Sequence, residues 1–481
     1  MRRRGALALL APLLAPVLAQ RTVELGVPDA HAALGLARGA RYLVVPVHEY
    51  GLANRLRVLA SAAILAADEA RALVVDWRAT GACNATLGDL FDGARVFGGA
   101  FPPELSGARA YAGDPRATAR LAALVNKSHP LAIGLASPAA PGAGAVAAPG
   151  AAPVLLVRNP SVVLSAELVA RARLHDIVLL RGNGFFVSEE LSCQEYFWRK
   201  QRVYAALAER VVAPLRAQLL DARRLLAAPV DGGGGGGARG NRVGLLVGVH
   251  VRAYDPAHDW AVVPPQPSNR SAAGAAEAGT WDEVAPLEAF AAAIGAMRAH
   301  GAAGARARFF VASNDARAKR ALIAAFPEPG ALVTLADEDD DARAGGGGGE
   351  ADAPPLASRD TPDGVRRALL EFLLLSGAVL ILHSYGSSFG EEAAAVHGVP
   401  SVRVRKGGHI YGTDLSMAQC NQPQLINAAR LREAAAAQNE SAISMKCYRD
   451  PSRPDEVCTP RITKSLCGGM IEAWGVPNVY C

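Results

Sequence analysis

Residues 378–405 have the sequence AVLILHSYGSSFGEEAAAVHGVPSVRVR, and this stretch decides the fold class. The run from Ala378 to His383 is short and apolar on both faces, so it predicts a buried strand. Ser388 to His397 predicts a helix, because Ser388 and Glu391 have the spacing of a capping box. Ser401 to Arg405 predicts another strand. A strand, a helix and a strand in this order are typical of a parallel sheet covered by helices.

The same alternation continues on both sides of this stretch and predicts an α/β protein. In the first half we expect a strand, a helix and a strand at Tyr42 to Val47, Ala53 to Ala70 and Ala72 to Trp77. In the second half we expect strands at Val243 to Val251, Arg308 to Ala312 and Ala331 to Leu335, with helices at Pro286 to His300, Ala316 to Phe326 and Pro362 to Ser376. Two Rossmann-like domains with parallel sheets facing a cleft follow from this pattern.

The length supports two domains, because 481 residues exceed the roughly 250–300 at which a single core stops growing. Three low-complexity stretches carry too little apolar surface to specify a fold. We expect an N-terminal domain at 40–228 with an Ala/Pro/Gly-rich insertion at 137–153, a Gly-rich linker at 229–241, a C-terminal domain at 242–415 with an insertion at 337–358, and a Cys-rich tail at 416–481.

The N-terminus and the cysteines both predict a secretory-pathway protein of the Golgi or ER lumen. Residues 1–19 combine three arginines with an apolar run, the pattern of a signal peptide or signal anchor, which would be the chain's only contact with a membrane. Five of the seven cysteines lie in the tail without zinc-ligand spacing, so we expect disulfides there. Four glycosylation sequons begin at Asn84, Asn126, Asn269 and Asn439. A net charge of +5, scattered along the chain, excludes a nucleic-acid-binding surface.

Four segments follow predicted strands, and the carboxyl ends of parallel strands are where ligands bind. Each has a purely structural alternative, namely an ordinary turn, an ion pair or a helix cap. Arg252 can direct two donors at a diphosphate, and the helix start at Ser387 and Ser388 offers amides and hydroxyls to a phosphate. The segments are 48–56 (HEYGLANRL), 248–255 (GVHVRAYD), 309–315 (FFVASND) and 383–392 (HSYGSSFGEE).

These segments resemble, in order, the motifs of the fucosyltransferase-like superfamily, which includes the α1,2-, α1,6- and protein O-fucosyltransferases. Residues 51–56 resemble the Gly-x-x-Asn-Arg-Leu region, and 247–252 the His-x-Arg motif. Residues 310–315 resemble the Ser/Thr-x-Asp segment, and 387–391 the Ser-Ser-Phe-Ser-Glu segment. The resemblance implies a GT-B fold and an inverting, metal-independent transfer from GDP-fucose to a glycan or glycoprotein hydroxyl, with no cofactor.

The resemblance also implies roles for individual residues. Arg252 would hold the β-phosphate and act in catalysis, and Asp315 would contact the nucleoside. The other donor-binding residues would be Asn54, Arg55, His250, Ser387, Ser388 and Phe389. The chain departs from the family pattern at Ala253, where many members have a second arginine, and at Ala53, where glycine is common.

The acceptor hydroxyl must lose a proton during an inverting transfer, so a base is expected beside it. Glu49 is our candidate by position, with His48, Asp255 and Asp259 as alternatives. Two other functions stay open. Residues 337–341 (DEDDD) contain the Asp-x-Asp spacing of metal-dependent glycosyltransferases, and carboxylates suit such a metal. Ala53 and Ala253 are also compatible with an inactive lumenal protein that binds a sugar nucleotide or a carbohydrate.

Overall fold

The computed structural model describes two compact units of the chain. The first unit draws on 1–50, 54–78 and 93–192, and the second on 51–53, 79–92 and 193–481. Within these, the described residues are 21–28, 30–34, 36–47, 50–92, 109–110, 151–158, 163–164, 166–182, 186–188, 191, 193–227, 246–253, 285–299, 307–335, 361–399, 401–404, 410–411, 443–449 and 456–462.

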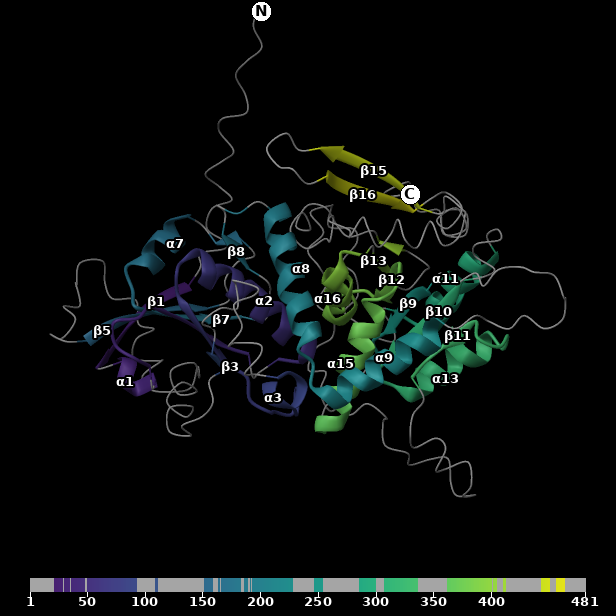
Figure 1. The fold of residues 1–481 in the computed structure, drawn as a ribbon, viewed down its shortest axis with the longest axis horizontal. Coiled ribbons are helices and arrows are strands. Elements are labelled where there is room, and N and C mark those ends of the chain that lie inside the picture. Colours follow the sequence, from purple (N-terminus) through teal and green to yellow (C-terminus); the bar gives the residue numbers. More distant parts are fainter. Residues whose placement is uncertain are drawn as a thin grey trace, which may run out of the picture. The chain divides into compact units, whose positions relative to one another are not determined.

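The first unit is built on a six-stranded sheet with the order β1-β5-β7-β2-β3-β4 (Figure 1). Its strands are β1 (Arg21–Pro28), β2 (Tyr42–Pro46), β3 (Ala72–Asp76), β4 (Arg109–Ala110), β5 (Ala151–Arg158) and β7 (Ile177–Arg181). All neighbours run parallel except β1, which pairs antiparallel with β5 at the edge. The helices α1 (Ala30–Leu34), α2 (Leu52–Asp68) and α7 (Ala166–Arg173) and a short pair, β6 (Val163–Leu164) with β8 (Val187–Ser188), complete it.

The second unit carries another six-stranded sheet, with the order β11-β10-β9-β12-β13-β14 (Figure 1). Its strands are β9 (Leu246–Val251), β10 (Arg308–Ser313), β11 (Leu332–Val333), β12 (Leu380–Ser384), β13 (Ser401–Val404) and β14 (Ile410–Tyr411). Only β14 pairs antiparallel. The helices are α3 (Leu87–Leu90), α8 (Cys193–Glu209), α9 (Ala213–Ala227), α11 (Leu287–Ala299), α13 (Ala316–Ala325), α15 (Pro362–Leu375) and α16 (Ser388–His397).

The sheet of the second unit is buried on both faces, as its apolar strands require. The side chains of Val247, Val249 and Val251 pack with Phe309 and Phe290 in one core cluster. On the other face, a Cβ at Gly248 would lie 2.9 Å from Leu375 Cδ2, so glycine allows α15 to pack closely against β9. The predicted α/β fold with two parallel sheets is confirmed, and the predicted strands and helices of both halves are present.

Two expectations need correction. The insertion expected at 137–153 ends inside a strand, because Ala151 to Pro153 belong to β5 and pair with β1. Eight residues of ladder with β1, together with parallel pairing to β7, specify this strand despite its alanines. The division between the units lies before Cys193 and not in the Gly-rich stretch at 229–241. The two helices before that stretch belong to the second unit, since α8 contacts α16 and α9 contacts α15.

The tail contributes one hairpin of β15 (Ile443–Arg449) and β16 (Glu456–Ile462), whose register places Cys447 opposite Cys458. The other tail cysteines lie outside the described residues, so the predicted disulfides stay a prediction. The signal segment at 1–19 and the linker at 229–241 also lie outside them. No helix of the described part of the chain is long and apolar enough to cross a membrane.

Candidate functional site at the strand ends of the second unit

The strand order of the second unit indicates where a ligand site is expected, at the carboxyl ends of two neighbouring strands. From the central strand β9 the chain moves outward to β10 and β11, and then crosses to β12 and β13 on the other side. The order therefore reverses between β9 and β12. In open parallel sheets, ligands bind at the carboxyl ends of the strands on either side of such a reversal. His250 lies near the end of β9, Arg252 lies just beyond it, and Ser384 ends β12.

Arg252 lies just beyond the end of β9 and is half-buried. Its backbone N–H donates to Ser384 Oγ at 2.8 Å. The next residue, Ala253, donates its N–H to Asn314 Oδ1 at 2.9 Å and accepts from Asn314 Nδ2 at 3.1 Å. Side chains from both neighbouring strand ends thus fix the backbone that carries Arg252.

His250 is buried and lies between two residues of the fourth segment. Its ring stacks on Phe389, with centroids 4.7 Å apart, and its Nδ1 lies 3.3 Å from Ser387 Oγ. Burial lowers the pKa of His250 well below its usual value, and His383 and Arg252 lower it further. The imidazole is therefore neutral at physiological pH. A neutral ring orients Ser387 without placing a second cation beside Arg252.

His383 lies next to His250 across the β9–β12 ladder and beneath the start of α16. A Cβ at Gly390 would lie 2.3 Å from His383 Cβ, so only glycine lets the helix start cross this strand so closely. Burial is the main cause that lowers the pKa of His383 to about 4, with Glu391 and Arg403 acting in opposite directions. The contact between Gly390 and His383 therefore fixes how closely the start of α16 packs on β12.

The start of α16 differs from the prediction in one respect. The N-cap is Ser387, one residue earlier than expected, and it makes no side-chain cap hydrogen bond. The predicted capping box of Ser388 with Glu391 is therefore wrong. Ser387 Oγ lies beside His250, and Glu391 accepts from Arg403 Nη2 at 2.5 Å. The backbone amides of a helix start attract anions, and Ser388 and Phe389 form this first turn, both half-buried.

Asp315 occupies the position that the structural alternative predicted for it. It caps α13, where its Oδ1 accepts from the backbone N–H of Arg317 at 2.7 Å. Burial alone would raise the pKa of Asp315, but the hydrogen bonds and charge of Arg317 outweigh it and lower the pKa. The carboxylate is engaged within its own helix turn, and its role toward a nucleoside stays a prediction.

The predicted residues of the first unit lie at the start of α2. Arg55 is fully buried; its Nε donates to the Tyr50 carbonyl and its Nη1 to the Arg78 carbonyl, both at 2.6 Å. Its guanidinium also lies over the Trp77 ring, 5.4 Å from the centroid. These contacts give Arg55 a packing role at the ends of β2 and β3. Asn54 is half-buried on the first turn of α2.

The candidate bases lie outside the described residues. This applies to Glu49 and its alternatives His48, Asp255 and Asp259. The acidic run 337–341 also lies outside them, so the metal-dependent alternative is not tested there. Within the part of the chain that is described, no three His, Cys, Asp or Glu side chains gather as a metal site would require.

The sequence did not single out several residues that the fold brings to this region. Asn314 lies inside a motif segment and Ser384 follows a predicted strand, but neither pattern indicates a role for the side chain. A buried cluster also lies behind α16, where Lys200 Nζ is 2.7 Å from Glu392 Oε2 and Tyr204 donates to the same carboxylate. A lysine among the aromatic residues of α8 is a sequence signal for a buried charge. Its partner could not be predicted from it, because Glu392 lies 192 positions later in the chain.

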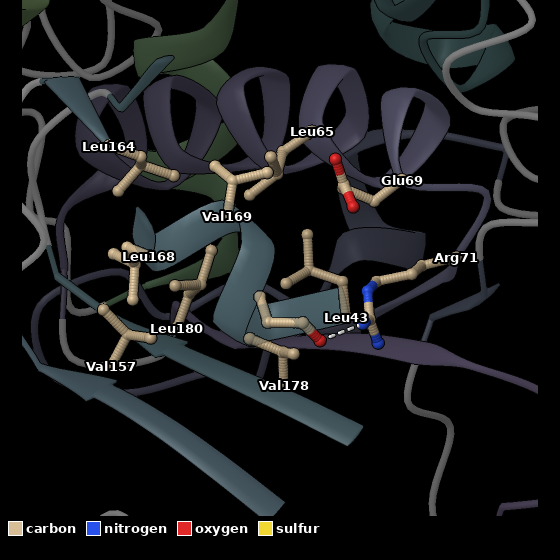
Figure 2. A pocket seen from close by; sticks show the side chains of 11 residues that line it. Leu43, Leu65, Glu69, Arg71, Val157, Leu164, Leu168, Val169, Val178 and Leu180 are labelled. Carbon is tan, nitrogen blue, oxygen red and sulfur yellow. Dashed lines mark hydrogen bonds between the residues drawn. The ribbon is translucent and has the colours of Figure 1, made fainter. Parts of the chain in front are cut away.

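A small cavity in the first unit does not coincide with this site. Figure 2 shows apolar side chains around it, with Glu69 and Arg71 at one end. Its volume is about 20 Å³, room for about one water. Arg71 donates to the backbone carbonyls of Tyr42, Asp176 and Ala172, and burial lowers its pKa to about 10. The cavity is a packing void beside Leu43 and Val178, near the amino ends of their strands.

No protein-family model matches the sequence, and no curated protein matches it. Solved structures do. Fucosyltransferase NodZ from Bradyrhizobium is 15% identical, with 77% of this chain and 98% of that chain covered at a TM-score of 0.41. A mutant of Arabidopsis thaliana FUT1 in complex with GDP is 13% identical, with 77% and 73% covered and a TM-score of 0.45. POFUT1 in complex with GDP-fucose is 11% identical, with 76% and 98% covered and a TM-score of 0.37. At these values the similarity does not by itself assign an activity to this chain.

Proposed function

We propose that this protein is a glycosyltransferase that transfers fucose from GDP-fucose to a hydroxyl of a glycan or glycoprotein, with inversion and without a metal. The observation that supports it is the convergence of three motif segments at one reversal point. His250 and Arg252, Asn314, and Ser384 with Ser387 come from separate segments and are joined by hydrogen bonds. A site for a nucleoside diphosphate needs a cation and amide donors at such a strand edge.

In the proposed reaction, the acceptor oxygen attacks the anomeric carbon of fucose as its bond to the β-phosphate oxygen breaks. Negative charge develops on the departing GDP. Arg252 and the amides at the start of α16 stabilise that charge, which is the task a metal performs in other glycosyltransferases. The proton of the acceptor passes to a base, for which Glu49 remains our candidate. Neutral His250 holds Ser387 and stacks on Phe389, and so orders this end of the site.

The proposal includes the cellular address. Residues 1–19 direct the chain into the secretory pathway as a signal peptide or anchor, where GDP-fucose and glycoprotein acceptors are its partners. Expression of the full chain in mammalian cells, followed by N-terminal sequencing and glycosidase digestion, tests this. A cytosolic product without glycans would contradict it.

Titration calorimetry of the lumenal chain with GDP, GDP-fucose, UDP and CMP, with and without EDTA, tests the donor. We expect binding of the two guanine ligands that EDTA leaves unchanged. Preference for UDP, or binding only with a divalent metal, would contradict the proposal and favour a metal-dependent transferase. Saturable GDP binding without hydrolysis or transfer across an acceptor screen would favour the inactive binding protein.

A further inference from the structure

Side chains form hydrogen bonds to the backbone of the two residues that follow the central strand β9. Its ladder with β10 ends at the pair Val251 and Ser313. Beyond it, Asn314 meets both the N–H and the C=O of Ala253, at 2.9 and 3.1 Å. On the other side, Ser384 Oγ accepts the N–H of Arg252 at 2.8 Å. The side chains of Asn314 and Ser384 therefore take the place of the backbone groups with which a longer neighbouring strand would pair.

These hydrogen bonds are needed because the neighbouring chains turn away here. β10 turns into α13 after Ser313, and β12 turns toward α16 after Ser384. Ala253 is 5% exposed, and Ser384 is fully buried. Buried backbone groups require a partner, and an amide side chain can donate and accept at once.

We infer that Asn314 and Ser384 are positioning residues that fix the direction of Arg252 toward the diphosphate of the nucleotide. This inference rests on the proposed function. Both side chains are neutral, so they hold the backbone of Arg252 without attracting its guanidinium. A carboxylate at position 314 would accept from Ala253 but could not donate to its carbonyl, and its charge would compete with a phosphate for Arg252.

The test compares GDP with GMP, because the proposal assigns Arg252 to the β-phosphate, which GMP lacks. Titration calorimetry measures both ligands on the wild-type chain and on Asn314→Ala, Asn314→Asp, Ser384→Ala and Arg252→Ala. We expect each variant to weaken GDP binding by roughly tenfold, within the range seen for coupled groups in contact. GMP binding should change by less than about twofold.

A double-mutant cycle then separates positioning from a general loss of structure. In the Arg252→Ala background, Asn314→Ala should leave GDP affinity unchanged within about twofold, because the residue acts through Arg252. Ser376→Ala is the matched control for Ser384→Ala. Ser376 is also fully buried and also hydrogen-bonds through Oγ to the protein, at Leu373 on α15. It should lower the melting temperature without changing the ratio of GDP to GMP affinity.

Each outcome bears on the inference. Equal losses for GDP and GMP, additive effects in the cycle, or unchanged GDP binding in the Asn314 and Ser384 variants would overturn it while the proposed function stands. If Asn314→Ala fails to fold, Asn314→Asp, which keeps one hydrogen bond, carries the same comparison. A wild-type chain that binds GDP no better than GMP would overturn the proposed phosphate role itself, and that result appears before any variant is made.

Discussion

The two units build the same sheet edge and use it differently. In the first unit, β2 lies between β3 and β7, so the strand order reverses there as it does between β9 and β12. The arginine after β2, Arg55, is fully buried and donates to two carbonyls of its own unit. The arginine after β9, Arg252, is half-buried, and neutral side chains hold its backbone. Arg252, half-buried directly after a strand, is therefore a better site candidate than Arg55, which is fully buried on the first turn of α2.

The two units also differ in the exposure of their ion pairs. In the second unit, Lys200 and Glu392 are each 2% exposed and face each other from α8 and α16. In the first unit, the Arg173 partner of Glu69 is 47% exposed. Solvent screens the exposed Glu69–Arg173 pair but not the buried Lys200–Glu392 pair. A buried charge pair thus holds α16, the helix that begins at the candidate site, against α8, and the first unit has a weaker pair at the end of α2.

The largest expected effect is the loss of that buried pair. Glu392→Gln removes the carboxylate that pairs with buried Lys200, which should destabilise the second unit by about 3–5 kcal/mol. Glu69→Gln, the matched change in the first unit, should cost only about 1 kcal/mol, because Arg173 is solvated. Differential scanning calorimetry of both variants measures this. Equal losses would contradict the contrast between the units, and the pair Lys200→Met with Glu392→Met should recover most of the loss if charge is the cause.

The two arginines give the next effect. Arg252→Ala should slow fucose transfer by about 10²- to 10³-fold, since a lost donor to a developing anion costs about 2.7–4 kcal/mol. Its melting temperature should stay near that of the wild type. Arg55→Ala should instead lower the melting temperature, because it removes two hydrogen bonds to the half-buried carbonyls of Tyr50 and Arg78 and the packing of a fully buried side chain. A stable Arg55→Ala protein with impaired GDP binding would instead support the prediction that Arg55 contacts the donor.

Much of the fold was readable from the sequence because its signals are local. The strand, helix and strand at 378–405 appear within one or two residues of the expected bounds, since apolar runs and Gly398 define them. Edge strand β1 and its partner β5 were missed. Their pairing joins residues over 120 positions apart, and no local sequence pattern predicts such a pairing.

The site was readable only in part, for the same reason. The sequence singled out Arg252, His250 and Ser387 because motif order and strand ends mark them, and the fold places them together, while their roles stay a prediction. Asn314 and Ser384 were not, since their roles depend on contacts 61 and 132 positions away. Arg55 matched the motif, but its burial is a property of packing and could not be read from its neighbours in the chain.

A smaller effect separates the units in acid. Burial holds the pKa of His383 at about 4, below its unfolded value of about 6.5, so the native state resists protonation. Stability is complete above the unfolded pKa and is lost as the pH falls from about 6.5 toward 4. The loss at pH 5 should be about 2 kcal/mol from this residue, and buried His250 adds to it. Scanning calorimetry at pH 7 and pH 5 measures this loss of stability. His383→Gln should make the loss smaller. An equal loss in this variant would contradict the assignment to His383.

The smallest effect lies at the end of α2, in the first unit. Ala70 has a φ of 48°, the left-handed conformation that closes a helix and that disfavours any residue with a Cβ. Ala70→Gly should therefore stabilise the first unit by about 1 kcal/mol, the strain outweighing the entropy that glycine adds to the unfolded chain. Gly398→Ala, which introduces the same strain after α16 at a φ of 62°, is the mirror control and should destabilise the second unit by a similar amount. Calorimetric transitions that move in the same direction for both variants would contradict this assignment of strain.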